Sequence, residues 1–529
     1  MATRADLALA GILVLHVALA LACALRFELG FDETMHVWMA HASPLSQVVR
    51  ELRLEAHPPL HHIVLRALTS PDSAAAWLRL PTIAGSALAL LGLHRVAVEA
   101  GVSRGVALAV TLMGAISWTN LNLAACVRAY TLAAGFTWLA LVPWMQILRD
   151  PGRASRALPW LLLWGTLAVC TEYSAGLVLA VCGAALAVLA PRDPAPWSAL
   201  VAACRMRWRL LVPLLPVAIL GGLYLRATGT EFALQHLGTH VRGADQPALA
   251  FLGEAVHRQA ALFTPLTSAS GLAELAVTLG FTLALVAAAW RGPRTARAVA
   301  LGLALLWALG AALAMARLHP FGGKARHQHH YLLLQLLALA IALHYGLPGW
   351  RGLRAGAVAL VLALAGFSAA TAARRGPIEE FPAAPLHGQE ADALLRRVDP
   401  DTVLCLSPYD VVVVFGRTRA AHWRGAGRVA GGGGRYLVEG SPRLREVLRT
   451  PYWRISDRSV PDVAQWLGQA LGELGRDSVQ VGILHDAELA DPQARRAAWA
   501  GSLPAGLQLA EWSVAERAEL VVVRRSTIR

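Results

Sequence analysis

An acidic pair, Asp32 and Glu33, comes directly after the first apolar stretch of the sequence, Leu7 to Leu25. That stretch is long enough to cross a bilayer, so the two carboxylates are expected at a membrane surface. A charge left inside hydrocarbon costs roughly 3 kcal/mol or more, and ionisable side chains at such places tend to serve a substrate. A carboxylate there has the chemistry of a general base, which removes a proton from an attacking hydroxyl or amine. The pair is equally suited to capping a surface helix, because acids are favoured at a helix N-terminus.

Other polar segments interrupt the apolar sequence and supply cations, histidines and one more acid. One of them contains Lys324, the only lysine among 48 basic residues. On one membrane face, these carboxylates and cations suit attack on a group carried by a lipid phosphate, because the cations would stabilise the phosphate that departs. The candidate substrate-binding residues are His57, Arg128, Tyr130, Glu172, Lys324, Arg326, His330 and Tyr331.

Several of these candidates also have a plainer interpretation. The two prolines that follow His57 are typical of a rigid turn, which would leave the imidazole at the surface. Arg128 and Glu172 are suited to a structural ion pair between helices. The histidines near residue 330 are suited to an interfacial position without a special role.

The sequence predicts no certain cofactor. Asp32, Glu33, His57 and His61 have the ligand types for a divalent metal, which stays open, but their spacing matches no known metal motif. The six cysteines form no Cys-x-x-Cys spacing, so a structural zinc site is not expected.

The composition predicts a membrane protein. Of 529 residues, 56% are hydrophobic and 16% are charged, and the mean hydropathy is +0.49, whereas a soluble domain carries about 25% charged residues. We predict a mainly α fold, a polytopic transmembrane helix bundle of about eleven spans. With only Arg4 before it, the first span is expected to be a retained helix rather than a signal peptide. The spans are expected at residues 6–25, 80–99, 105–123, 131–148, 157–171, 174–191, 210–226, 272–290, 298–316, 331–347 and 355–373.

Arginine-rich short loops predict the orientation of the bundle. By the positive-inside rule, the loops that carry them are cytoplasmic, which places the N-terminus inside and the C-terminal tail outside. We read the net charge of +14 as topology and contact with anionic lipid, since nothing resembles a nucleic-acid module. The bias toward arginine, alanine and glycine indicates a bacterial protein, and hence a bacterial plasma (inner) membrane. The loops expected inside are residues 149–156, 192–209, 291–297 and 348–354, and those expected outside are residues 26–79, 227–271 and 317–330.

Two regions outside the spans are expected to be structured. In the first outer loop, residues 34–52 and 60–69 read as interfacial helices whose apolar sides lie along the membrane. From residue 374 the composition becomes that of a soluble α/β domain, so we expect two domains, residues 1–373 and 374–529. The glycine run at 431–434 is read as a flexible loop. Strands are expected at 402–406, 411–415, 478–484 and 519–523, and helices at 388–398, 459–475 and 490–500.

The sequence resembles the C-type glycosyltransferase superfamily (GT-C), in particular its bacterial branch related to protein O-mannosyltransferases and the lipid A aminoarabinose transferase. The resemblance covers residues 1–373 and rests on Asp32-Glu33, on His-Pro-Pro-Leu from His57, on Arg-Ala-Tyr-Thr-Leu from Arg128, and on the basic segment that leads into Tyr331. It implies that Asp32 is the catalytic base and Glu33 the adjacent acid. It also implies that Lys324 and Arg326 hold the donor phosphate.

The sequence therefore predicts a membrane glycosyltransferase that moves a sugar from a polyprenyl-phosphate donor to an acceptor on the extracytoplasmic face. Nucleotide sugars are scarce outside, so the donor is expected to be lipid-linked, and direct displacement would invert the anomeric centre. The expected partners are this donor, a glycan, lipid or protein acceptor, and membrane lipids, with no nucleic acid. A transporter or flippase of lipid-linked sugars, or a non-catalytic membrane scaffold, remains the alternative, although no internal repeat of the transporter kind is visible.

Overall fold

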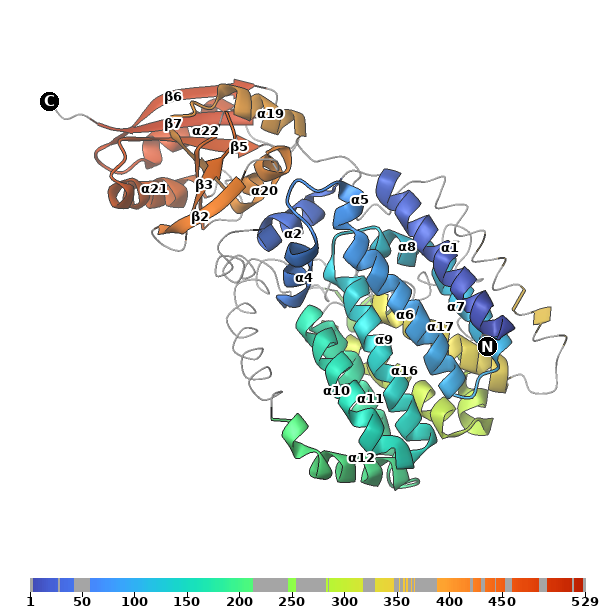
Figure 1. The fold of residues 1–529 in the computed structure, drawn as a ribbon. Coiled ribbons are helices and arrows are strands. Elements are labelled where there is room, and N and C mark those ends of the chain that lie inside the picture. The colour runs from blue at the N-terminus through green and yellow to red at the C-terminus, as the bar shows by residue number, and fades with distance from the viewer. Residues whose placement is uncertain are drawn as a thin grey trace. The chain divides into compact units, whose positions relative to one another are not determined.

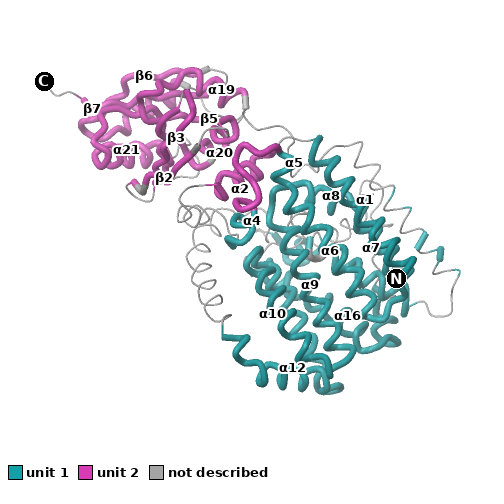
Figure 2. The backbone as a smooth tube through the Cα atoms, in the orientation of Figure 1, with its two compact units in different colours: residues 1–27, 52–64, 75–380 teal, residues 28–51, 65–74, 381–529 magenta. Residues whose placement is uncertain are grey.

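Contacts between residues divide the chain into two compact units, which Figure 2 colours separately. Unit 1 takes residues 1–27, 52–64 and 75–380, and unit 2 takes residues 28–51, 65–74 and 381–529. The computed structural model describes residues 3–26, 29–41, 58–212, 246–253, 282–316 except 284, 329–346, single positions between 352 and 366, 388–418, 422–429, 433–451 except 443, 459–484, 492–515 and 518–526.

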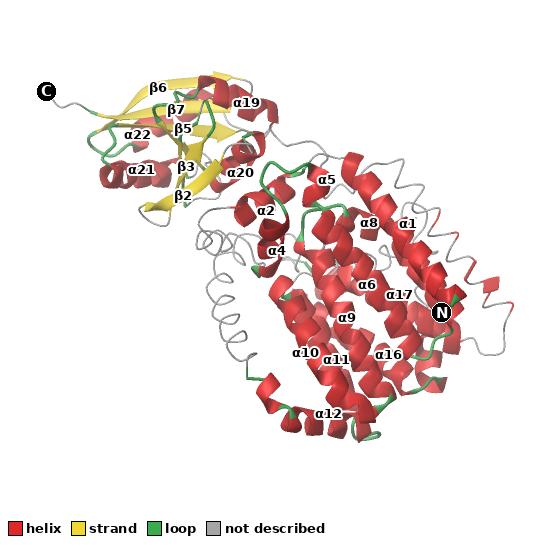
Figure 3. Ribbon diagram, in the orientation of Figure 1, coloured by secondary structure: helices red, strands yellow, loops and turns green. Residues whose placement is uncertain are grey.

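Unit 1 is built from helices throughout its described part (Figures 1 and 3). A π-helical turn, Ala342–Gly346, continues α17 (His329–Ile341). A short 3-10 turn, Pro151–Arg153, joins α9 (Ala129–Arg149) to α10 (Ala154–Thr171). The helices are α1 (Arg4–Arg26), α5 (Ala75–Leu78), α6 (Leu80–Glu99), α7 (Arg104–Ile116), α8 (Trp118–Ala124), α9 (Ala129–Arg149), α10 (Ala154–Thr171), α11 (Ser174–Leu189), α12 (Ala195–Met206), α16 (Arg294–Met315) and α17 (His329–Ile341).

Within the described residues, four helices are long and apolar enough to cross a membrane: α1, α6, α9 and α16. The predicted span 105–123 is instead two helices, α7 and α8, bent by 60° at Ser117. Counted as one broken span, the pair raises the number to five. α11 is apolar but shorter, and most of residues 210–226, 272–290 and 355–373 lies outside the described part. The predicted number of eleven spans is therefore not confirmed.

α6 and α9 run parallel and approach each other closely, because glycines face the partner helix. A Cβ atom on Gly85 would lie 2.4 Å from Cα of Leu132, and one on Gly135 would lie 2.6 Å from the carbonyl oxygen of Gly85. Small residues let helix backbones approach in this way in membrane proteins, where van der Waals packing rather than hydrophobic burial holds helices together. α7 and α8 form the connection between α6 and α9 and run back along these two helices.

One end of the helix bundle collects the arginine-rich turns, and we call it the Arg149 end. Arg149 lies 3.3 Å from a carboxylate oxygen of Glu99. Arg294 donates to the carbonyl oxygen of Leu148 at 3.0 Å and pairs with Asp193. These contacts place the C-terminal ends of α6, α9 and α11 beside the start of α16, as expected if the arginine-rich loops share one side of the membrane.

The opposite end, which we call the Arg128 end, holds the junctions between the same helices. Arg79 donates to the carbonyl oxygen of Ala24 at 2.7 Å, which joins the start of α6 to the end of α1. Thr82 donates to the carbonyl oxygen of Ala124 at 2.9 Å, which brings in the end of α8 just before Arg128. α17 also begins here, since its first residue, His329, contacts α8.

In its described residues, unit 2 contains a mixed sheet of seven strands in the order β2-β3-β4-β1-β5-β7-β6. β1 pairs in parallel with both β4 and β5, and the other pairs are antiparallel. The strands are β1 (Val403–Leu406), β2 (His422–Val429), β3 (Gly433–Glu439), β4 (Glu446–Arg449), β5 (Ser478–Leu484), β6 (Leu507–Ala515) and β7 (Ala518–Arg525). The helices that lie wholly in this unit are α2 (Phe31–His41), α19 (Gly388–Arg397), α20 (Pro408–Arg417), α21 (Val460–Leu474) and α22 (Pro492–Ser502).

The α/β character of this unit is as predicted, but one predicted strand is wrong. Residues 411–415 form part of α20, because Ser407 caps the helix by accepting a hydrogen bond from the backbone N–H of Asp410 at 3.1 Å, and Pro408 follows at the first helical position. The run of buried β-branched residues then packs as a buried helix, which an apolar run alone does not distinguish from a strand. The glycine run also differs from a plain loop, since β3 begins at Gly433, where a Cβ atom would lie 2.5 Å from the ring of Trp466.

The predicted first outer loop, residues 26–79, also differs from the expectation of interfacial helices. The apolar side chains of α2 are covered by protein, with Met35, Trp38 and Met39 at most 5% exposed. α4 (Leu60–Leu68) does expose Ile63 and Leu68, at 44% and 58%. α2 therefore belongs to the folded part of unit 2, whereas an interfacial role for α4 stays a prediction.

Candidate functional site

The acidic pair lies in the first turn of α2, and the two carboxylates differ in what they contact. Glu33 is 5% exposed, and its Oε2 accepts a hydrogen bond from the backbone N–H of Gly30 at 2.9 Å. This bond satisfies a backbone donor at the helix start, as the glutamate of a capping box does. Asp32 is only partly buried. The capping interpretation therefore fits Glu33, and Asp32 is the better candidate for a base.

The other end of α2 is held by the last turn of α4 and by Thr69, which follows it. Nε2 of His41 lies 3.2 Å from the hydroxyl of Thr69, which itself donates to the carbonyl oxygen of Leu65, so the imidazole must be the donor to Thr69. Arg66 donates to the carbonyl oxygen of Ala40 at 3.2 Å. Burial, followed by the nearby Arg66 charge, lowers the pKa of His41 to about 4, so the ring is neutral at ordinary pH.

In unit 1, Arg128 and Tyr130 lie where α9 begins. Arg128 is the residue before the first turn, with φ −142°, and it is 5% exposed. Its guanidinium carbon lies 5.6 Å from the ring centre of Tyr130, a cation–π distance. A buried cation at a helix N-terminus adds to the positive end of the helix dipole, so this position favours an anion.

Glu172 ends α10 at the same end of the bundle, because the short turn Pro151–Arg153 makes α9 and α10 antiparallel. It is 8% exposed, and its Oε1 lies 3.4 Å from the backbone N–H of Ser174. Burial and the neighbouring Glu172 charge raise the pKa of Tyr173, which keeps this phenol protonated. The structure thus brings Arg128, Tyr130 and Glu172 to one end of unit 1.

A buried polar network at the Arg128 end was not predicted from the sequence. Nε2 of His329 lies 2.8 Å from Oδ1 of Asn120, which also accepts from Ser86 at 3.2 Å. Ser86 in turn lies 2.8 Å from Nε2 of His16, and all four side chains are fully buried. The available signal was the presence of polar residues within or at the start of apolar stretches, which are costly in a membrane without a partner.

Several predicted site residues lie outside the described part of the chain. These are His57, Lys324 and Arg326, and of His330 and Tyr331 only the backbone, in the first turn of α17, is described. Their roles stay predictions. Over the described residues, no three histidine, cysteine, aspartate or glutamate side chains are arranged to hold a metal ion.

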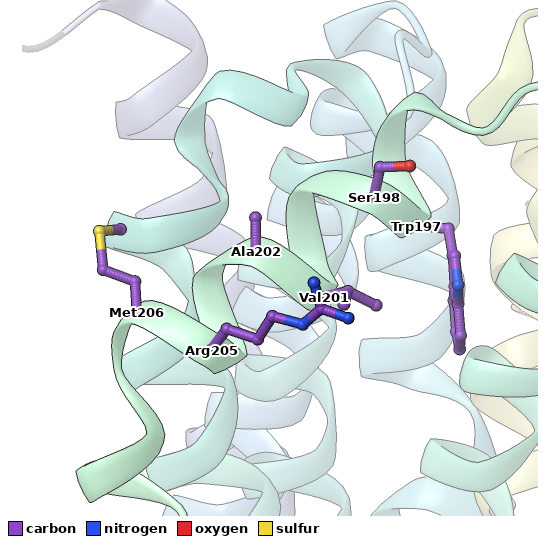
Figure 4. Close-up of a pocket in the computed structure, with 6 residues that line it drawn as sticks. All are labelled: Trp197, Ser198, Val201, Ala202, Arg205 and Met206. Atoms are coloured by element: carbon purple, nitrogen blue, oxygen red, sulfur yellow. The ribbon is translucent and has the colours of Figure 1, made fainter.

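A hollow of about 690 Å³ lies along α12, lined by Trp197, Arg205 and Met206 among others (Figure 4). α12 packs on α10 and on the turn Pro151–Arg153, which places the hollow at the Arg149 end. It is therefore remote from Arg128 and Glu172. The chain immediately after α12, residues 213–245, is outside the described part, so the hollow supports no site.

No protein-family model and no curated protein sequence matches the chain. Among solved structures, it is similar to the apo crystal structure of ArnT from Cupriavidus metallidurans, with a TM-score of 0.54 at 14% identity over 97% of this chain and 98% of that one. The arabinofuranosyltransferase AftD from Mycobacteria gives 0.48 at 15% identity, covering 97% of this chain and 41% of AftD. The oligosaccharyltransferase AglB from Archaeoglobus fulgidus gives 0.47 at 12% identity, covering 89% and 69%.

The last two scores are below 0.5, so the fold assignment depends on ArnT, over almost the full length of both chains. ArnT is an aminoarabinose transferase of the GT-C type. This is the superfamily that the acidic pair and the basic segment resemble. The chain therefore has the fold of the C-type glycosyltransferase superfamily.

Proposed function

We propose that the chain is a membrane glycosyltransferase that moves a sugar from a polyprenyl-phosphate donor to an acceptor on the extracytoplasmic face, with inversion of the anomeric carbon. One observation carries the proposal. In a chain with the ArnT fold, the buried Arg128 lies at the same end of unit 1 as the start of α17, the helix that follows Lys324 and Arg326 in the sequence. ArnT itself has also been crystallised with undecaprenyl phosphate.

The proposed reaction is a direct displacement. Asp32 accepts the proton of the acceptor hydroxyl or amine, the acceptor atom forms its bond to the anomeric carbon, and the bond from that carbon to the phosphate oxygen breaks. The lipid phosphate leaves with the electron pair and gains negative charge. Lys324, Arg326 and Arg128 are proposed to stabilise that charge, together with the N-terminus of α9.

Partners and location follow from the same proposal. The acceptor is a glycan, lipid or protein, and the surrounding membrane is the bacterial inner membrane with the Arg149 end on the cytoplasmic side. The positive-inside rule supports this orientation, because Arg149, Arg153 and Arg294 all lie at that end.

One feature of unit 1 has a counterpart in transporters, the bent pair α7 and α8. Transporter helices break near the middle of the bilayer, where the substrate binds. Here α8 ends at Ala124, which contacts Thr82 at the Arg128 end. The break therefore lies toward one end of the bundle, and it supports a flippase less well than a transferase.

The test is sugar transfer by the full-length protein in detergent or vesicles, with a labelled polyprenyl-phosphate sugar as donor. Asp32→Asn should lower turnover by about 10²–10⁴-fold, and Lys324→Ala should raise KM for the donor and lower kcat, with only partial recovery in Lys324→Arg. Asp150→Asn, at the Arg149 end, is the matched control. Release of the product anomer opposite in configuration to the donor would support inversion.

Two results would contradict this proposal. If Asp32→Asn keeps more than half of the wild-type turnover, Asp32 is not the base. If the wild-type protein moves the intact lipid-linked sugar across vesicles without cleaving it, the chain is a flippase.

A further inference from the structure

The helix that carries the acidic pair is packed by the C-terminal part of the chain. Residues 28–51, which include α2, and residues 65–74 group with residues 381–529 in unit 2 (Figure 2). α2 and α20 are in contact, although they are far apart in the sequence. The α/β domain is therefore completed by a helix from the first outer loop.

Thr34 of α2 and Gly416 of α20 lie close together. A Cβ atom on Gly416 would lie 3.1 Å from the methyl carbon of Thr34, closer than an ordinary carbon–carbon contact. The hydroxyl of Thr34 donates to the carbonyl oxygen of Gly30 at 3.0 Å. Gly30 also donates its N–H to Glu33, so the contact with α20 acts on the same helical turn as Asp32.

One turn further along α2, Trp38 packs into an aromatic cluster of the α/β domain. Trp38 is 1% exposed, and its ring centre lies 5.9 Å from that of Tyr436 on β3. Tyr436 lies 6.1 Å from Trp423 on β2, and Trp423 meets Phe415 edge to face at 5.7 Å. Phe415 is next to Gly416, so one surface of the domain holds α2 at two successive turns.

We propose that the C-terminal α/β domain positions the catalytic base: its α20 and its β2–β3 surface hold α2, and thereby aim the carboxylate of Asp32. This inference rests on the proposed transferase function. In it, Asp32 is the catalytic residue, and Thr34, Trp38, Gly416 and Tyr436 are positioning residues. The physical reason is that proton transfer requires hydrogen-bond distance, and a misplacement of about 1 Å can cost about 10²-fold in rate.

The test is a size exchange at the contact between Thr34 and Gly416, in the full-length protein. Gly416→Ala should lower kcat by about threefold to tenfold and Gly416→Val by more, with KM for the lipid donor unchanged, because the added carbons displace the turn that carries Asp32. Alanine is a better helix former than glycine, so α20 itself is not weakened by the first change. Combining Gly416→Ala with Thr34→Ser should restore kcat, because serine removes the methyl group and keeps the hydroxyl that bonds Gly30.

Gly472→Ala is the matched control, since Gly472 lies in α21 of the same domain and a Cβ atom there meets nothing within 4 Å. It should leave kcat unchanged. Amide hydrogen exchange of residues 34–40 provides a second measurement that needs no substrate. Exchange there should accelerate in Gly416→Val and return toward wild type when Thr34→Ser is added.

The two measurements separate the possible failures. Wild-type kcat in Gly416→Val, despite faster exchange in α2, would overturn the positioning role while leaving the transferase proposal intact. A change confined to KM for the acceptor would identify the domain as an acceptor-binding module instead. Absence of transfer by the wild-type protein would remove the proposed function, and this inference with it.

Discussion

At the residue scale, the two neighbouring acids differ in their burial. Glu33 caps its own helix, because its carboxylate accepts a hydrogen bond from the backbone N–H of Gly30 at 2.9 Å. Asp32 is only partly buried. The two acids are adjacent in the sequence, and the structure gives Glu33 a capping contact with its own helix.

The capping contact of Glu33 predicts different stabilities for two Glu33 variants. Glu33→Gln keeps an amide oxygen that can accept from Gly30, so stability and transfer should stay close to wild type. Glu33→Ala removes the acceptor and should cost about 1 kcal/mol of stability, as the loss of a helix cap does. Thermal unfolding and transfer assays of both variants check this. Loss of transfer in Glu33→Gln with unchanged stability would show instead that Glu33 takes part in the reaction.

His41 predicts a pH dependence of the packing of α2. Its pKa is lowered from 6.5 to about 4 in the folded chain, by burial first and then by Arg66, while Asp72 opposes the shift. Above about pH 6.5 the ring is neutral in both the folded and unfolded states, so protonation of His41 does not reduce the free energy of unfolding there. As the pH falls from 6.5 toward 4, the unfolded chain binds a proton that the folded chain excludes, and stability is lost.

Hydrogen exchange of residues 34–41 at pH 7.5 and pH 5 should therefore show faster opening at the lower pH, after correction for intrinsic rates. His41→Gln, which retains a donor for Thr69, should reduce that pH difference. An equal pH effect in both proteins would assign it to other groups.

At the scale of elements, unit 1 depends on close approach between α6 and α9. Gly85→Val would place carbon atoms against the backbone of Leu132, which cannot move as a flexible side chain does. We expect the free energy of unfolding to fall by about 1–3 kcal/mol, the usual cost of overpacking. Gly183→Val in α11 is the matched control, because a Cβ atom there meets nothing within 4 Å. Melting temperatures in detergent compare the two, and equal melting would show that α6 and α9 tolerate separation.

At the scale of the whole molecule, the arginine-rich turns predict the orientation of unit 1. Arg153 lies at the Arg149 end, and Ala316 follows α16 at the Arg128 end. In a background without native cysteines, a membrane-impermeant thiol reagent should label Ala316→Cys in intact spheroplasts and should not label Arg153→Cys. The reverse pattern would place the Arg128 end in the cytoplasm, where a lipid-linked donor is no longer required.

Much of the helical architecture could be predicted because apolar runs and the polar residues that end them are local features of the sequence. α1, α6 and α9 agree with the predicted spans to within a few residues, since each is one apolar run between polar ends. β1, β5 and β7 were predicted from short β-branched runs. Residues 411–415 were misassigned because the same kind of run is compatible with a buried helix, and the capping signal at Ser407 was stronger than the strand propensity.

The sequence by itself determined the class of the protein, the clustering of basic residues between its helices and the segments that hold its candidate chemistry. These are properties of composition and of neighbouring residues. Only the tertiary structure decided that α2 belongs with the C-terminal domain, that Glu33 caps its own helix, and that His16, Ser86, Asn120 and His329 form one buried network. Such contacts join residues from distant parts of the chain, and their energy depends on distance in space, which no local pattern records.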